Sequence, residues 1–264
     1  MKNIYDELLN LHRGKGAGVL VTVVKTIGSG PVDSGTKMLV YPDNSIIGTV
    51  GGGSIEQLAI EKALKILTTH KNCLEEYSMD ESESGTATGM LCGGTATLFF
   101  EYFAPRNHLY IFGAGHIGKA LVYHLKNLDY FITVIDDRKN VLDEIDGADR
   151  KVPGKFESVL SDSEVAENAW FIIATYQHKY DGLVLNRIFK SGWNPQYVGM
   201  VASRRKQKVL LNELKAEVPD ADTSKCFIPV GLDIGGGSPD EIALSIIAEI
   251  QKVRFGKSGR HLRA

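Results

Sequence analysis

The stretch Phe112-Gly113-Ala114-Gly115-His116-Ile117-Gly118 decides the fold of the second half of the chain. It follows an apolar run that predicts a strand over residues 109–112, and it opens a helical pattern over residues 116–128. The next predicted strand, residues 132–135, runs into two acidic residues. Glycines at this spacing, between a strand and a helix, are typical of a dinucleotide-binding βαβ unit.

Each residue of this loop has an expected role. Gly113 allows the turn, Gly115 lets a pyrophosphate approach the backbone, and Gly118 lets the helix pack closely on the sheet. We expect Asp136, with Asp137 beside it, to accept a hydrogen bond from a ribose 2′-hydroxyl and to repel a 2′-phosphate. His116 is either a phosphate partner or an ordinary residue of the first helical turn.

The alternation of strands and helices continues outward from this motif. It predicts a parallel sheet covered by helices on both faces. The further strands are expected at 170–175, 197–201 and 227–230, and the further helices at 180–189, 204–214 and 239–253. Ser238, Pro239 and Glu241 stand where an N-cap, a first helical residue and the second half of a capping box belong.

The chain before the linker 104–107 has a different pattern, with short helices, strands and one hairpin. Its helices are expected at 4–11 and 54–67, and its strands at 19–24, 37–41, 45–50 and 95–103. We expect Ser54 to cap the second helix, with Gln57 as its capping-box partner. The predicted fold class is α/β, with a C-terminal Rossmann-like parallel sheet domain (108–255), a smaller N-terminal α+β domain (1–104) and a basic tail (256–264).

Composition excludes several classes of protein. With 30 Lys and Arg against 32 Asp and Glu, the net charge of −2 gives no general attraction to nucleic acid. No apolar run approaches the roughly 20 residues of a membrane span, and the first residues are polar, so we expect a soluble cytoplasmic protein. The three cysteines form no CxxC pair, and we assign no metal ligands.

Two polar clusters follow predicted strands of the second domain, where ligands bind in open parallel sheets. His178 and Asp181 share one helix face and are candidates for proton transfer or metal binding; alternatively, Asp181 caps the helix and His178 is solvated. Ser203, Arg204 and Arg205, followed by Lys206, form a candidate anion site. A solvated helix end is the alternative, although basic charge opposes the helix dipole there.

Other glycine-rich stretches are candidates for ligand binding. Gly235 and Gly236 leave room ahead of the last helix. In the first domain the candidates are Gly51, Gly52, Gly53, Ser54, Glu56, Cys92 and Gly93. Cys92 lies among glycines, and its thiolate is a candidate soft ligand or sulfur carrier; the alternative for each cysteine is a small buried hydrophobe.

Taken in order, these motifs resemble the XdhC/CoxI family over almost the whole chain. The resemblance rests on Gly28-Ser29-Gly30-Pro31, Gly35 to Val40, Gly48 to Glu56, Cys92-Gly93-Gly94, Phe112 to Gly118, His178 with Asp181, Tyr197 to Gly199 running into Ser203-Arg204-Arg205, and Pro229 to Gly235. It implies an accessory factor that binds molybdenum cofactor (molybdopterin) as cargo. It also implies a role in sulfuration of that cofactor and in its insertion into a molybdenum hydroxylase such as xanthine dehydrogenase.

The resemblance also implies partners and roles. The partners are an apo-molybdenum hydroxylase and a cysteine desulfurase, and we expect a homodimer. The glycine loops and Ser203-Arg204-Arg205 suit the cofactor phosphate, and Cys92 would face the molybdenum. Relatives commonly have Cys where this chain has Ser54, so that thiol role falls to Cys92 or the cofactor is delivered by another route.

Two other functions remain open. The Rossmann-like domain also fits an NAD(H)-dependent oxidoreductase, with NAD(P) as its cofactor, or a regulatory nucleotide-binding module without catalysis. Three cysteines cannot hold the iron–sulfur clusters of a complete xanthine dehydrogenase.

Overall fold

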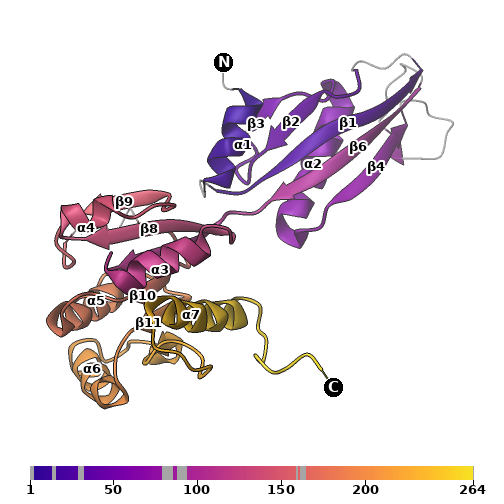
Figure 1. The fold of residues 1–264 in the computed structure, drawn as a ribbon. Coiled ribbons are helices and arrows are strands. Elements are labelled where there is room, and N and C mark those ends of the chain that lie inside the picture. The colour runs from indigo at the N-terminus through magenta and orange to yellow at the C-terminus, as the bar shows by residue number, and fades with distance from the viewer. Residues whose placement is uncertain are drawn as a thin grey trace. The chain divides into compact units, whose positions relative to one another are not determined.

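A computed structural model of the chain describes residues 3–13, 16–28, 33–78, 86–87, 94–158, 160 and 165–263. The chain divides into two compact units, Met1–Arg106 and Asn107–Ala264 (Figure 1). The second unit is a Rossmann domain, and the first is built on a mainly antiparallel sheet. This α/β arrangement confirms the predicted fold class.

The second unit contains a six-stranded parallel sheet in the order β12-β11-β10-β7-β8-β9. Its strands are β7 (Asn107–Phe112), β8 (Tyr130–Asp136), β9 (Arg150–Pro153), β10 (Trp170–Ile173), β11 (Tyr197–Met200) and β12 (Cys226–Phe227). The chain starts at β7, proceeds outward to β9, and then returns to the other side of β7 with β10. The carboxyl ends of β7 and β10 therefore meet at a topological switch point, where ligands bind in such sheets.

Helices cover both faces of this sheet. They are α3 (His116–Leu125), α4 (Lys139–Asp143), α5 (His178–Lys190), α6 (Arg204–Glu217) and α7 (Pro239–Arg254), and a 3₁₀ turn, η2 (Thr223–Lys225), precedes β12. The apolar strands alternate their side chains between two cores, so that Ile111 packs with α3 and α7 while Phe112 packs with α5 and α6. The capping box predicted for α7 is present, with Ser238 and Glu241 bonded reciprocally.

The first unit is a six-stranded sheet in the order β3-β2-β1-β6-β4-β5. Its strands are β1 (Gly18–Gly28), β2 (Lys37–Val40), β3 (Ile46–Gly48), β4 (Cys73–Ser78), β5 (Thr86–Ala87) and β6 (Gly94–Phe103). Helix α2 (Gly53–Thr69) packs its buried residues against one face of the sheet. Helix α1 (Ile4–His12) packs Leu11 against Leu20 and Leu39.

Some local predictions differ from the structure. Ser54 is not the cap of α2, because the tight glycine turn lets the helix begin at Gly53 and leaves Gly52 as the N-cap. The strand β4 was not predicted, since Glu75 and Glu76 interrupt its apolar alternation. The expected loop 80–89 lies mostly outside the described residues.

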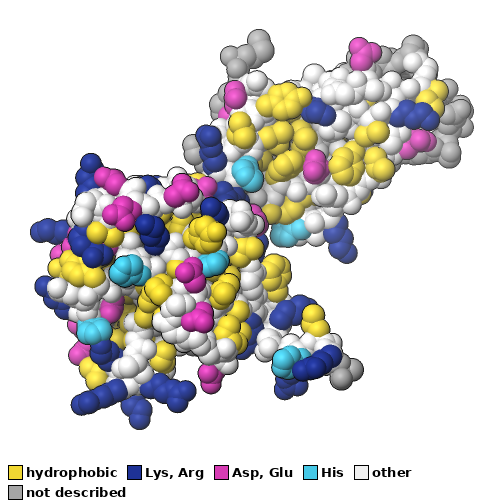
Figure 2. All heavy atoms as spheres, viewed as in Figure 1, with side chains coloured by type: hydrophobic (Ala, Val, Ile, Leu, Met, Phe, Trp, Pro, Cys, Tyr) yellow, Lys and Arg dark blue, Asp and Glu magenta, His cyan; other side chains and the backbone are white. Residues whose placement is uncertain are grey.

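Acidic and basic side chains are interspersed over the face shown in Figure 2, as the net charge of −2 leads one to expect. Of the helices that the structure describes, none has the length and apolar character needed to cross a membrane.

Candidate functional site

Two cavities of the second unit lie at the carboxyl ends of its parallel strands. The first, here called the loop cavity, has a volume of about 530 Å³ and is lined by Gly115, His116, Lys119, Arg138, Thr175 and Tyr176 among others. The second, here called the α6 cavity, has a volume of about 380 Å³ and is lined by His178, Asp181, Ser203, Arg205, Lys206 and Leu210 among others. Both volumes are in the range of small-molecule sites.

The three glycines of the loop are needed for different reasons. A Cβ on Gly113, whose φ is +115°, would lie 2.1 Å from the carbonyl oxygen of Ala174, and a Cβ on Gly118 would lie 1.9 Å from the carbonyl oxygen of Gly113. The fold therefore requires both residues to be glycine. Gly115 has no heavy atom within 4 Å of such a Cβ, so the space beside it is open and belongs to the loop cavity. A ligand can approach its backbone closely.

Asp136 is fully buried and does not face the loop cavity, in contrast to the expected ribose contact. Its Oδ2 accepts hydrogen bonds from the Ala114 amide (2.7 Å) and Arg138 Nη2 (2.9 Å), and its Oδ1 accepts from the amide and Nε of Arg138 (2.9 Å each). Burial acts to raise the pKa of Asp136, but the bonds from Arg138 and Ala114 outweigh it and hold the pKa below its ordinary value. Asp136 thus fixes both the glycine loop and Arg138.

Arg138 and Tyr176 are two residues of this cavity that sequence reasoning missed. The guanidinium carbon of Arg138 lies 4.1 Å from the centroid of the Tyr176 ring, and the Tyr176 hydroxyl donates to Asp137 Oδ2 at 2.9 Å. The second acidic residue of the motif therefore orients the tyrosine on which Arg138 stacks. The signal available in the sequence was the position of Arg138 directly after Asp136, the last residue of β8, and Asp137.

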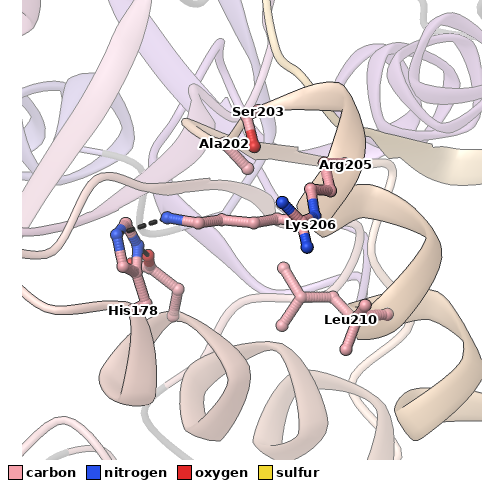
Figure 3. A pocket seen from close by; sticks show the side chains of 8 residues that line it. His178, Ala202, Ser203, Arg205, Lys206 and Leu210 are labelled. Carbon is pink, nitrogen blue, oxygen red and sulfur yellow. Dashed lines mark hydrogen bonds and ion pairs between the residues drawn. The ribbon is translucent and has the colours of Figure 1, made fainter.

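The α6 cavity brings together the two polar clusters predicted separately. His178 and Asp181 come from the first turn of α5, and Ser203, Arg205 and Lys206 come from the start of α6 (Figure 3). The ammonium of Lys206 contacts His178 Nε2, and His178 Nδ1 lies 3.5 Å from Asp181 Oδ2.

The contacts of this cluster determine where protons lie. A charged Lys206 can only donate, so Nε2 of His178 accepts and the proton of a neutral imidazole lies on Nδ1, toward Asp181. The Thr175 hydroxyl lies within donating distance of two acceptors, the Gln177 carbonyl at 2.9 Å and Asp181 Oδ1 at 2.5 Å. Burial raises the pKa of Asp181 despite the opposing bonds from Thr175 and His178.

This arrangement places positive charge beside side chains that are able to exchange protons. Ser203 is the N-cap of α6 and its hydroxyl bonds no backbone amide of the helix, and Arg205 and Lys206 add positive charge at the same helix end. Val209 and Leu210 supply an apolar wall, which suits a flat ring attached to an anionic group. Arg204 is exposed and does not line this cavity.

The remaining candidates lie elsewhere. Gly51, Gly52, Gly53 and Ser54 form the turn and first residues of α2, where Glu56 accepts a hydrogen bond from the Val50 amide at 3.2 Å. Gly235 and Gly236 precede α7 and line neither cavity. Cys92 and Gly93 lie outside the described residues. Gln177, not Asp181, is the N-cap of α5. Within the described ranges, no group of three His, Cys, Asp or Glu side chains is placed to hold a metal ion.

Comparison with protein families gives two matches. The XdhC Rossmann domain matches residues 109–250, and the XdhC and CoxI family matches residues 11–78. Together these matches include most of the residues that build both units and both cavities.

Two curated proteins are similar in sequence. YqeB of Escherichia coli (strain K12), described as uncharacterized, is 30% identical over 263 residues, which is 97% of this chain and 47% of YqeB. A protein of Bacillus subtilis (strain 168), described as a probable xanthine dehydrogenase subunit, is 28% identical over 162 residues, which is 61% of this chain and 47% of that protein. The chain spans about half the length of these relatives.

A solved structure shares the fold. A crystal structure of a xanthine dehydrogenase from Bacillus halodurans superimposes with a TM-score of 0.52 at 19% identity, over 97% of both chains.

Proposed function

Because the chain belongs to the XdhC and CoxI family, we propose that it is an accessory protein in the maturation of a molybdenum hydroxylase such as xanthine dehydrogenase. In this role it binds the molybdenum cofactor as cargo, supports its sulfuration and delivers it to the apo-hydroxylase. The name of the Bacillus subtilis relative is consistent with a xanthine dehydrogenase as the partner.

The observation that carries the proposal is the composition of the α6 cavity. Molybdopterin combines a flat, hydrogen-bonding pterin with a phosphate, and its dithiolene already holds the metal. The protein must therefore recognise a ring and an anion. Arg205 and Lys206 supply cations for the phosphate, and Leu210 supplies an apolar surface for the ring. His178 and Asp181 are donors and acceptors within reach of the same space.

Sulfuration needs a further group that accepts sulfur and gives it to the molybdenum. Cys92 is our candidate for this role, with a cysteine desulfurase as the source of the sulfur. A homodimer and the apo-hydroxylase complete the proposed set of partners.

The test is binding and transfer of isolated molybdenum cofactor by the full chain. Binding is followed by the absorbance of the cofactor and by its retention on gel filtration, and transfer by reconstitution of an apo-xanthine dehydrogenase. Arg205→Gln is expected to weaken cofactor binding by about tenfold or more, because a charge-assisted hydrogen bond contributes about 1.5–3 kcal/mol.

The matched control is Lys208→Gln, which removes the same charge from an exposed position of α6 that does not line the cavity. It is expected to bind the cofactor like the wild type. A folded wild-type chain that neither binds the cofactor nor reconstitutes the hydroxylase would refute the proposed function. Equal losses in the two variants would refute the α6 cavity as the binding site.

A further inference from the structure

The α6 cavity accounts for the cargo, but it leaves the loop cavity without a ligand. The distinctive feature of the loop cavity is that the Arg138 guanidinium is held rigidly at its wall. Asp136 binds it with two hydrogen bonds of 2.9 Å, from Nε and Nη2, and its central carbon lies over the Tyr176 ring, 4.1 Å from the centroid. A guanidinium fixed in this way loses little entropy when it binds a ligand.

Arg138 retains binding capacity toward the cavity. Of the five N–H groups of an arginine side chain, Asp136 takes two, and no other described residue takes the remaining three. The side chain is 34% exposed, so these groups are accessible from the loop cavity that Arg138 lines.

The acidic residue that would select an unmodified ribose is not available. In Rossmann domains a carboxylate after the second strand accepts a hydrogen bond from the ribose 2′-hydroxyl, whereas a nearby arginine accommodates a 2′-phosphate. Here Asp136 is fully buried and both of its oxygens are bonded to Arg138 and Ala114. Asp136 therefore presents no oxygen to a ribose hydroxyl, and the groups of this pair that stay open toward the cavity are N–H donors of Arg138.

Other charged groups lie in or near this cavity. Lys119 and Glu144 form an ion pair of 3.5 Å, and both side chains are more than half exposed, so their opposite charges largely cancel. Asp137 accepts a hydrogen bond from Tyr176 and does not line the cavity, although its negative charge acts on Arg138. Arg138, which shares the cavity wall with His116, keeps N–H groups that the described residues leave open to an anionic ligand group.

We propose that the loop cavity binds a dinucleotide with a phosphate monoester on its adenosine ribose, the chemistry of NADP, and that Arg138 selects this phosphate over a hydroxyl. The pyrophosphate of the same ligand fits the open space beside Gly115 at the N-terminus of α3. This inference goes beyond the proposed function and does not depend on it.

The experiment titrates the full chain with NADP⁺ and with NAD⁺ by isothermal calorimetry, in buffer without any molybdenum species. We expect NADP⁺ to bind at least about tenfold more tightly than NAD⁺, since the difference is one charge-assisted phosphate contact. The affinity for NADP⁺ is also expected to fall more steeply with added salt. Because no cofactor cargo is present, the result is independent of the reconstitution assay.

Variants test whether Arg138 is the selecting residue. Arg138→Gln is expected to bring the two affinities within about threefold of each other, and Arg138→Lys, which keeps the charge but loses the planar fork, is expected to show a preference between those of the wild type and Arg138→Gln. The matched control is Lys139→Gln, because Lys139 is the adjacent cation, 77% exposed, and does not line the cavity. It should retain the preference of the wild type.

Thermal unfolding of each variant verifies that it is folded, since Arg138→Gln leaves the buried Asp136 with only its two backbone donors. Equal affinity for the two nucleotides, preference for NAD⁺, or binding of neither nucleotide by the folded wild type would overturn the proposal. So would an equal effect of Arg138→Gln and Lys139→Gln, because the preference would then reflect net charge alone.

Discussion

Replacement of Gly115 by alanine separates the requirements of the fold from the requirements of a ligand. The backbone at Gly115 has φ −68° and ψ −167°, which alanine adopts without strain, and its added Cβ meets no heavy atom within 4 Å. Alanine restricts the unfolded chain and so stabilises the folded state by about 0.4–1 kcal/mol relative to glycine. As an N-cap, however, alanine is less favourable than glycine by a similar amount. The free energy of unfolding should therefore change by less than about 1 kcal/mol.

The comparison variant is Gly113→Ala in the same loop. Its φ of +115° costs alanine about 1–2 kcal/mol, and the 2.1 Å approach of its Cβ to the Ala174 carbonyl adds roughly 1–3 kcal/mol of overpacking. A unit of this size loses roughly 2–4 °C of melting temperature per kcal/mol of destabilisation. Gly113→Ala should therefore lower the melting temperature by roughly 4–20 °C, whereas Gly115→Ala should change it by less than about 4 °C.

The assay is differential scanning calorimetry of both variants, followed by nucleotide titration of those that are folded. Gly115→Ala should lose nucleotide affinity by about tenfold or more, because its methyl group occupies the space from which a phosphate reaches the backbone amides. A Gly115→Ala protein that melts as early as Gly113→Ala would refute the structural part of this reasoning. A stable Gly115→Ala protein with unchanged nucleotide affinity would refute the assignment of the open space to a ligand.

Two further predictions concern the pH dependence of stability, measured by urea unfolding at a series of pH values. The hydrogen bonds of Asp136 lower its pKa, so the stability that it contributes is present at neutral pH and is lost as the pH falls through the folded-state pKa. Asp136→Asn should therefore lower the free energy of unfolding by about 2–3 kcal/mol at neutral pH and by less in acid. A loss that does not depend on pH would contradict this prediction. Burial raises the pKa of Asp181, so the native state holds this proton more tightly than the unfolded state does. The wild type therefore loses stability as the pH rises above the ordinary range of a carboxyl pKa. Asp181→Asn should be at least as stable as the wild type at neutral pH, and this advantage should shrink in acid. An Asp181→Asn protein that is less stable at neutral pH than in acid, relative to the wild type, would contradict a raised pKa of Asp181.

Local patterns in the sequence were sufficient for most of the elements in the second unit. The glycine loop, the apolar strands and the capping box at Ser238 each involve residues close together in the chain, and each lies where the pattern placed it. The elements that were missed, such as β4, depend on a partner strand elsewhere in the chain. Its charged residues are tolerated because β4 pairs with β6 over its whole length.

The α6 cavity likewise has features that follow from local sequence and features that depend on tertiary packing. The sequence placed His178 with Asp181, and Ser203 with Arg205, each after a strand of a parallel sheet, and this order alone brings them to one edge. It did not show that the two pairs share a cavity, because the meeting of Lys206 and His178 depends on how α5 and α6 pack on β10 and β11.

The sequence by itself determined the Rossmann topology, the position of the glycine loop and the edge of the sheet where ligands bind, because these follow from the order of residues along the chain. Only the tertiary structure decided the role of Asp136. Its carboxylate is buried beneath the loop and bonded to Arg138, so the member of this pair that lines the cavity is the arginine and not the acid. The physical reason is that burial and hydrogen bonding in three dimensions, rather than residue type, determine which charge a ligand meets.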